Sequence, residues 1–189
     1  MADTFYSNHY SAEIGATGHF TTKQGPPIDR VRSGFGGSRK RHKFCQLNVP
    51  SGQDLGAGDI IRLMDVKSGD RPTALFITSD ANWGATADFD IGLYLKGDDN
   101  DGAVVDVDLF ETTPYDISGA VTRVDVLTLA VLDEWDRCKT FWELADIGAA
   151  TITSDPRVTY TIAMTAVGDT SATAALVEML VELEYIAGD

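Results

Sequence analysis

The chain has 189 residues, 43% of them hydrophobic, which suits a single domain with a core of ordinary size. Twenty-nine acidic side chains outnumber 15 basic ones and give a net charge of −14, which disfavours nucleic acid and lipid headgroups as principal partners. No apolar run approaches the roughly 20 residues that a membrane-spanning helix needs.

The charge is unevenly distributed. Residues 1–43 carry a balance of +4, whereas residues 44–189 carry −18. Residues 1–43 also lack a sustained hydrophobic period and are interrupted by Gly, Ser and Pro, so they cannot bury a face of their own. We expect them to form an extended basic arm that docks on a neighbour, with a disordered tail as the alternative. Residues 44–189 are expected to form one β-sandwich domain.

The first strand signals follow a loop that ends near residue 58. Residues 60–66 and 74–78 are rich in apolar and β-branched residues, and a turn at 68–72 separates them. Residues 80–84 form a loop before the strongest pattern in the chain.

Residues 87–110 predict a β-hairpin. Phe89, Ile91, Leu93 and Leu95 alternate with polar or small residues, so one strand face is predicted to be buried and the other solvated. The solvated face is expected to hold Asp88, Asp90, Gly92, Tyr94 and Lys96. The Gly- and Asp-rich segment 97–102 is typical of the turn that joins two such strands.

The remainder predicts three further strands and one helix. Residues 121–127, 158–166 and 174–186 have strand-like alternation, although a helix also fits 174–186; we choose a strand there. Thr140 and Glu143 match a capping box, and Gly148 is the expected stop of that short helix. The whole pattern predicts a mainly β, antiparallel two-sheet β-sandwich, jelly-roll-like, with one short helix and an extended N-terminal arm.

Motif searches favour no enzyme, cofactor or metal. The three histidines, His9, His19 and His42, all fall in the arm, and no catalytic His or Ser signature occurs. The acidic turn 97–102 does not match the ligand spacing of an EF-hand loop. The glycine-rich segment 34–39 lacks the third glycine of a dinucleotide-binding loop.

The cysteines and the N-terminus indicate the cellular compartment. Cys45 and Cys138 lack C-x-x-C spacing, so a disulfide scaffold or a zinc module is disfavoured, and buried thiols are expected. No basic residue precedes Lys23 and no apolar leader follows, so we expect no secretory signal.

Four segments together resemble a family of tailed-bacteriophage virion proteins. They are MADTFYSNHYSAE, GDIIRLMDVKSGDRP, DIGLYLKGDDNDGAVVDVDLF and TFWELADIG, which cover most of residues 1–187. The family is that of capsid decoration, or cement, proteins. The chain departs from the family's aromatic helix motif in one place, since Ala145 stands where the family has glycine.

The resemblance implies a β-sandwich, often trimeric, that sits on the outer capsid surface and locks neighbouring subunits of the major capsid protein. Synthesis is then expected in the cytoplasm of the bacterial host. On this reading the arm reaches across capsid subunits, and its contact residues are expected to be Phe5, Tyr6, Tyr10, Phe20, Arg30, Arg32, Phe35, Arg39, Lys40, Arg41 and Lys43.

Two alternatives remain open at the level of sequence. One is a carbohydrate-binding or adhesive β-sandwich, for which Trp83, Trp135, Tyr94 and Tyr115 are candidate platform residues. The other is a tail or connector component, which differs in copy number and symmetry.

Overall fold

The computed structural model describes residues 4–6, 40–81, 83–84, 86–97, 102–110, 113–128, 136, 139–145, 154–171 and 176–188. These residues form, in order, β1 (Thr4–Tyr6), β2 (Lys40–Val49), β3 (Asp54–Leu55), β4 (Ile60–Lys67), β5 (Arg71–Ser79), β6 (Asp88–Leu95), β7 (Val104–Asp106), β8 (Tyr115–Asp116), β9 (Val121–Asp125), the 3-10 helix η1 (Val126–Thr128), α1 (Phe141–Ala145), β10 (Thr159–Ala166), β11 (Thr170–Ser171) and β12 (Val177–Ile186).

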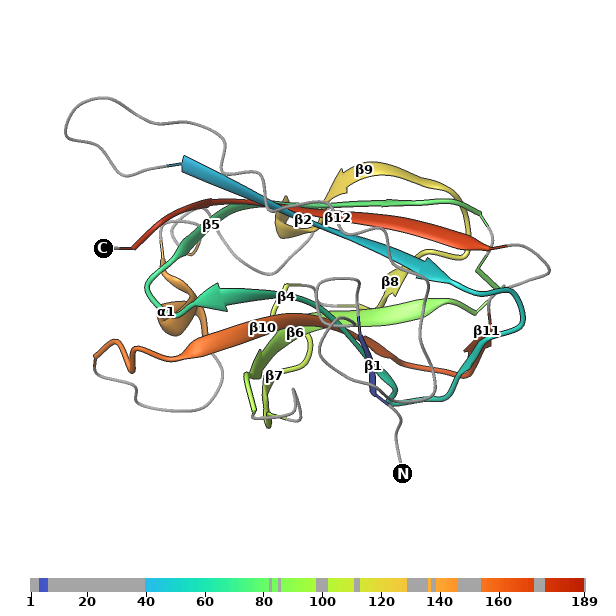
Figure 1. Ribbon diagram of the computed structural model, residues 1–189, viewed down its shortest axis with the longest axis horizontal. Coiled ribbons are helices and arrows are strands. Elements are labelled where there is room, and N and C mark those ends of the chain that lie inside the picture. The colour runs from blue at the N-terminus through green and yellow to red at the C-terminus, as the bar shows by residue number, and fades with distance from the viewer. Residues whose placement is uncertain are drawn as a thin grey trace.

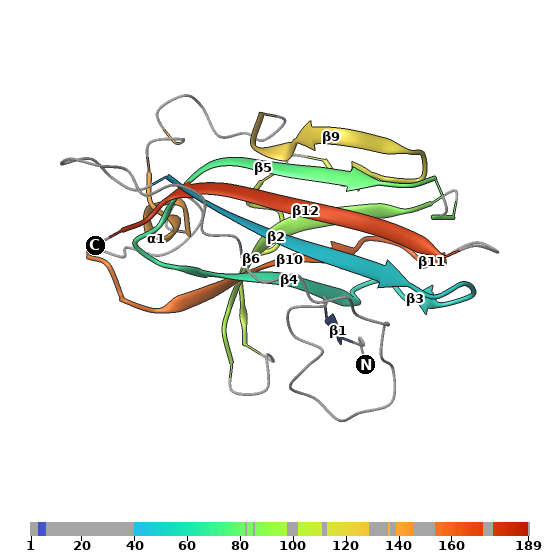
Figure 2. The ribbon, with the colours of Figure 1, turned by 45° about the horizontal axis from the view of Figure 1, so that its top comes forward.

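The strands form two packed layers (Figure 1). One sheet has the order β1-β4-β10-β6-β7, with β8 also paired to β6, and the other has the order β2-β12-β5-β9. The short strands β3 and β11 pair with each other as a separate two-stranded ribbon. Neighbouring strands are antiparallel except for β1, which lies beside β4 (Figure 2) and pairs in parallel with its first three residues. The predicted two-sheet sandwich with one short helix is confirmed, while jelly-roll connectivity stays a prediction.

The core lies between the sheets and follows the alternation of the strands. Of the four predicted inward residues of β6, Phe89, Ile91 and Leu93 are fully buried. The prediction is wrong for Leu95, the last residue of the strand, which is 39% exposed because it lies where the strand leaves the core. Residues 177–186 form the strand β12, as predicted, and β12 pairs along its length with both β2 and β5. β12 is a central antiparallel strand with one face in the core and the other on the outside, which is why its apolar residues alternate with glutamates.

The helix begins where the capping box predicts. The carboxylate of Glu143 accepts hydrogen bonds from the backbone N–H and the hydroxyl of Thr140, both at 2.7 Å. The first two helical N–H groups donate to backbone oxygens in the β4–β5 turn, from Phe141 to Asp70 and from Trp142 to Ser68. The helix ends at Ala145, and Gly148 lies outside the described residues.

The prediction that the outer face of β6 is solvated is wrong at Gly92 and Tyr94, which are both buried. The chain after β7 crosses Gly92 so closely that a Cβ there would lie 2.0 Å from the oxygen of Asp106. Arg62 covers the ring of Tyr94, with its guanidinium carbon 5.0 Å from the ring centre. The chain that follows β7 and the side chain of Arg62 therefore cover part of the outer face of this sheet. The alternation of apolar and polar residues along β6 gave no indication of this cover.

Candidate functional site

Five of the eleven predicted contact residues lie in described strands. Phe5 and Tyr6 belong to β1, and Lys40, Arg41 and Lys43 belong to β2. The other six lie outside the described residues: Tyr10, Phe20, Arg30, Arg32, Phe35 and Arg39. The structure thus places residues 40–43, which the sequence analysis assigned to the arm, in the first part of a domain strand.

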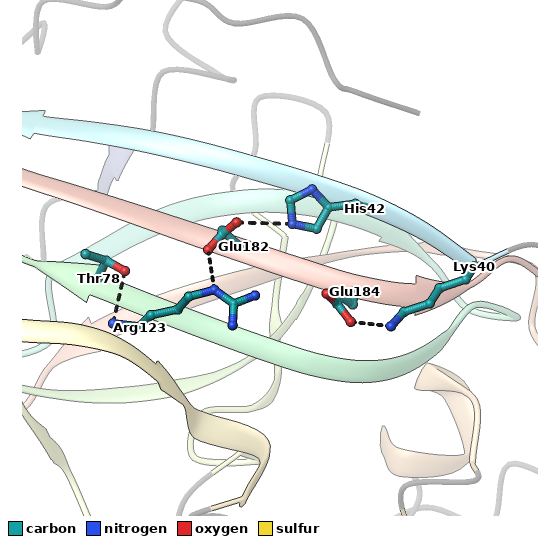
Figure 3. A network of polar contacts seen from close by, with 6 residues as sticks. All are labelled: Lys40, His42, Thr78, Arg123, Glu182 and Glu184. Atoms are coloured by element: carbon teal, nitrogen blue, oxygen red, sulfur yellow. Dashed lines mark hydrogen bonds and ion pairs between the residues drawn. The ribbon is translucent and has the colours of Figure 1, made fainter. Parts of the chain in front are cut away.

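Lys40 and His42 point to the outer face of the four-stranded sheet, opposite glutamates of β12 (Figure 3). The Nζ atom of Lys40 lies 2.5 Å from a carboxylate oxygen of Glu184, and Nε2 of His42 lies 3.3 Å from one of Glu182. The second contact is an ion pair only when His42 is protonated. The basic run predicted to meet an external acidic surface therefore already contacts acidic groups of its own sheet.

Lys43 points the other way, toward the space between the sheets. Its ammonium group donates a hydrogen bond to the backbone oxygen of Asp65 at 2.9 Å and lies 5.2 Å from the centre of the Tyr185 ring. Burial lowers the pKa of Lys43, and the nearby carboxylates of Asp70 and Asp65 raise it only in part. Lys43 therefore joins the two layers and does not extend from the surface.

Arg123 on β9 is a basic group of the same outer face that the sequence analysis did not single out. Its backbone has φ = +46°, in the left-handed region. The pairing of β9 with β5 shifts register here, so β9 has one more residue than β5 between two successive pairs. The chain at Arg123 is therefore a β-bulge, which turns the side chain away from the direction of a regular strand.

Arg123 makes two contacts through its side chain and one through its backbone N–H, and Figure 3 shows the two hydrogen bonds among them. Its guanidinium carbon lies 3.7 Å above the centre of the Phe76 ring. Its Nε donates to Glu182 at 3.3 Å, and its backbone N–H donates to the hydroxyl of Thr78 at 3.2 Å. The Arg123 side chain nevertheless remains 51% exposed. Glu182 thus accepts contacts from both His42 and Arg123.

A shallow depression of about 520 Å³ lies beside this cluster and is lined by residues of all four strands of the sheet. Along β12, Glu182 contacts Arg123, Leu180 lines the depression, and Glu178 lies two residues further on. The backbone N–H of Glu178 donates to a carboxylate oxygen of Asp80. The carboxylates of Asp80 and Glu178 thus lie at the end of the depression away from Arg123, whose own charge is paired with Glu182.

The aromatic platform considered for carbohydrate binding is wrong for two of its four residues. Trp83 is 2% exposed and donates its ring N–H to the hydroxyl of Ser79, and Tyr94 is 3% exposed. Tyr115 is half-buried, and Trp135 lies outside the described residues. Buried rings cannot stack on a sugar, so the structure does not favour this alternative.

The described part of the chain contains no cluster of three or more His, Cys, Asp or Glu side chains suited to a metal ion. Most of the acidic turn at 97–102 lies outside that part. Cys45 is a buried thiol, as expected, and Cys138 lies outside the described residues. None of the helices described has the length and apolar character of a membrane span.

Three residues of this cluster, Glu182, Glu184 and Arg123, were not predicted from the sequence, and the sequence signal for them differs. Glu182 and Glu184 alternate along a predicted strand, and a basic run that continued directly into strand-like sequence was available as their partner. No sequence signal pointed to Arg123, because residues 121–127 have the alternation of a regular strand.

Comparison with known proteins finds similarity in structure but not in sequence. No protein-family model and no curated protein sequence matches the chain significantly. The fold is similar to a chain in a solved structure described as the capsid of Ralstonia phage GP4, with a TM-score of 0.54 and 13% sequence identity. The match covers 98% of this chain and 99% of that chain. At this identity, the similarity shows a shared fold.

Proposed function

We propose that this protein is a structural component of a bacteriophage virion, a decoration protein that binds the outer surface of the assembled capsid and bridges neighbouring subunits of the major capsid protein. The end-to-end fold match to a chain of a phage capsid carries the proposal, because almost no part of either chain is left over. The sequence resemblance to phage decoration proteins supports the same class.

The net charge supports the outer surface. A chain with a charge of −14 is repelled by packaged DNA, which is a polyanion on the inner side of the shell. A protein that binds only the assembled lattice stabilises that lattice through mass action. If the protein is a trimer, several weak contacts act together and raise the affinity without stronger individual contacts.

The N-terminal segment is proposed to make part of the contact. Lys40 and Lys43 already have partners within the domain, so we assign the reach across capsid subunits to residues 1–39 and their aromatic side chains. This boundary sharpens the experiment. Deletion of residues 1–39 leaves β2 intact and removes only the three-residue strand β1 from the sheets, whereas deletion of residues 1–43 also removes the ion pair of Lys40.

Quantitative mass spectrometry of gradient-purified virions tests the proposal. We expect this chain at a copy number close to that of the most abundant capsid protein. A ratio tens of fold lower would assign it to the tail or connector, and its absence from virions would overturn the proposal.

The role of the segment is tested separately with the protein lacking residues 1–39. We expect its affinity for capsids to fall at least tenfold while its far-ultraviolet circular dichroism remains that of a β-sandwich. Undiminished binding by this folded variant would contradict the proposed contact by residues 1–39.

A further inference from the structure

The backbone of Arg123 is strained in a way that glycine would avoid. Among the described residues, Arg123 and Arg157 are the two non-glycine residues with a positive φ, at +46° and +53°. A residue with a Cβ atom adopts this conformation at a cost in free energy, and bulges of this kind usually place glycine there. Because Arg157 shares this backbone conformation, a positive φ alone assigns no role; Arg123 is distinguished by a side chain that Phe76 and Glu182 also hold in place.

The strained backbone and its contacts present the guanidinium group in one orientation. Phe76 supports its face and Glu182 accepts from Nε, which leaves the two terminal nitrogens directed away from Glu182 (Figure 3). A guanidinium edge with two parallel N–H groups matches a carboxylate. Because the side chain is already held in place, less rotamer entropy is lost when a partner binds.

We propose that Arg123 is a docking residue for a carboxylate of the capsid partner, which binds to the terminal nitrogens of its guanidinium group. This inference rests on the proposed function and identifies the chemistry of one contact. Arginine is also among the residue types that are enriched at the interface positions contributing most to binding.

The surroundings of Arg123 indicate how the partner segment is oriented. The adjacent depression of about 520 Å³ has room for side chains, and Asp80 and Glu178 lie at its far end. These carboxylates repel a second acidic group there. The docking segment is therefore expected to place Asp or Glu at Arg123 and a neutral or basic residue toward Glu178.

Protection of the β9 edge is the simpler explanation for a bulge and a charge at this position. It requires only an outward charge on the edge strand, and it predicts no effect of Arg123 on binding to capsids. Measured affinity therefore separates the two explanations.

Arg157→Gly is a matched control for Arg123→Gly. Both substitutions remove one positive charge and place glycine at a positive φ. Arg157 lies in the chain that leads into β10 of the other sheet, where its backbone N–H donates to the side chain of Asp155. It is exposed and lies outside the cluster on the four-stranded sheet.

The test measures the affinity of full-length variants for capsids purified without this protein, by co-sedimentation. We expect Arg123→Gly to lose at least tenfold in affinity, Arg157→Gly to remain within twofold of wild type, and both to stay folded by circular dichroism. Arg123→Lys retains the positive charge but lacks the two parallel N–H donors of the guanidinium group, so its affinity for capsids should also fall several-fold. The lysine variant therefore tests the proposed contact even if Arg123→Gly does not fold.

Several outcomes would overturn the inference. They are an affinity within twofold of wild type for both folded Arg123 variants, an equal loss in Arg157→Gly, or a change in the oligomeric state of Arg123→Gly by sedimentation velocity. The last would assign Arg123 to a contact between copies of this chain. Wild-type protein that fails to bind capsids would overturn the proposed function together with this inference, so the two failures are distinguishable.

Discussion

The ammonium group of Lys43 donates a hydrogen bond to the backbone oxygen of Asp65, 2.9 Å away, and joins strand β2 of one sheet to strand β4 of the other. Lys43 occupies an inward position of β2, where its neighbours Cys45 and Leu47 are apolar and buried. A cation in this position loses hydration, which is why burial is the main cause of its lowered pKa.

The first prediction concerns the pH dependence that Lys43 confers. Its pKa is lower in the folded protein than the usual 10.5, so between these two values the unfolded chain binds more protons and the free energy of unfolding rises with pH. We expect this rise to be absent in Lys43→Met. Urea denaturation of both proteins between pH 7 and pH 10.5 measures the difference.

Other groups that titrate in this range are shared by the two proteins and cancel in the comparison. Wild type should therefore gain stability relative to Lys43→Met as the pH increases. Two curves that run parallel over the whole range would contradict the burial of a charged Lys43.

The second prediction concerns Arg62, which is 1% exposed and ties β4 to the β6–β7 hairpin. One terminal nitrogen donates to the backbone oxygen of Gly102 at 3.0 Å, and the guanidinium group stacks on Tyr94. We expect Arg62→Ala to lower the free energy of unfolding by about 3 kcal/mol, because buried hydrogen bonds and packing are lost together.

Lys96→Ala is the control for Arg62→Ala. Lys96 is exposed and pairs with Asp65, and such surface ion pairs contribute at most about 1 kcal/mol. Chemical denaturation gives both values. Equal effects of the two substitutions would show that Arg62 does not hold the hairpin in place.

The third prediction concerns the close approach at Gly92. A Cβ atom there would lie 2.0 Å from the oxygen of Asp106 and 2.4 Å from that of Val107, so the crossing chain must move. We expect Gly92→Ala to cost about 3 kcal/mol and to reduce the hydrogen-exchange protection of the Phe110 N–H, which donates to Ile91.

Gly168→Ala serves as the control for Gly92→Ala, because nothing lies within 4 Å of the added carbon. Its free energy of unfolding should remain within about 0.5 kcal/mol of wild type. Unchanged protection of Phe110 in Gly92→Ala would mean that the crossing segment is not packed against β6.

The fourth prediction uses two aspartates whose pKa values shift in opposite directions. Burial, followed by the charge of Asp108, raises the pKa of Asp90, so its ionisation destabilises the fold above that raised value. Hydrogen bonds from the hydroxyl and N–H of Ser118 lower the pKa of Asp116, so its charge stabilises the fold at neutral pH and that contribution is lost as the pH falls through the lowered value.

We therefore expect Asp90→Asn to raise the thermal midpoint at pH 7 and Asp116→Asn to lower it slightly. The gain from Asp90→Asn should diminish as the pH falls toward the usual aspartate pKa of 3.8. A lower midpoint for Asp90→Asn at pH 7 would contradict this assignment, and differential scanning calorimetry measures both variants.

The local elements of the fold can be predicted from the order of the residues. Alternation along residues 89–93 and 177–185 follows from strand geometry, since successive side chains point to opposite faces whatever lies beyond them. The pairing of Thr140 with Glu143 is equally local, because three residues separate the two partners. Two half-apolar sheets then had to pack together, which made the sandwich predictable.

The segments that cover those faces, and the charged groups that contact one another, became known only from the folded arrangement of the strands. Arg62 contacts Gly102 across 40 residues, and Arg123 contacts Glu182 across 59. Each contact depends on how strands of distant sequence are ordered in a sheet, and alternation carries no information on that order. The left-handed backbone of Arg123 likewise follows from a bulge in its pairing with β5, so that the most distinctive group of the outer face became visible only in the folded chain.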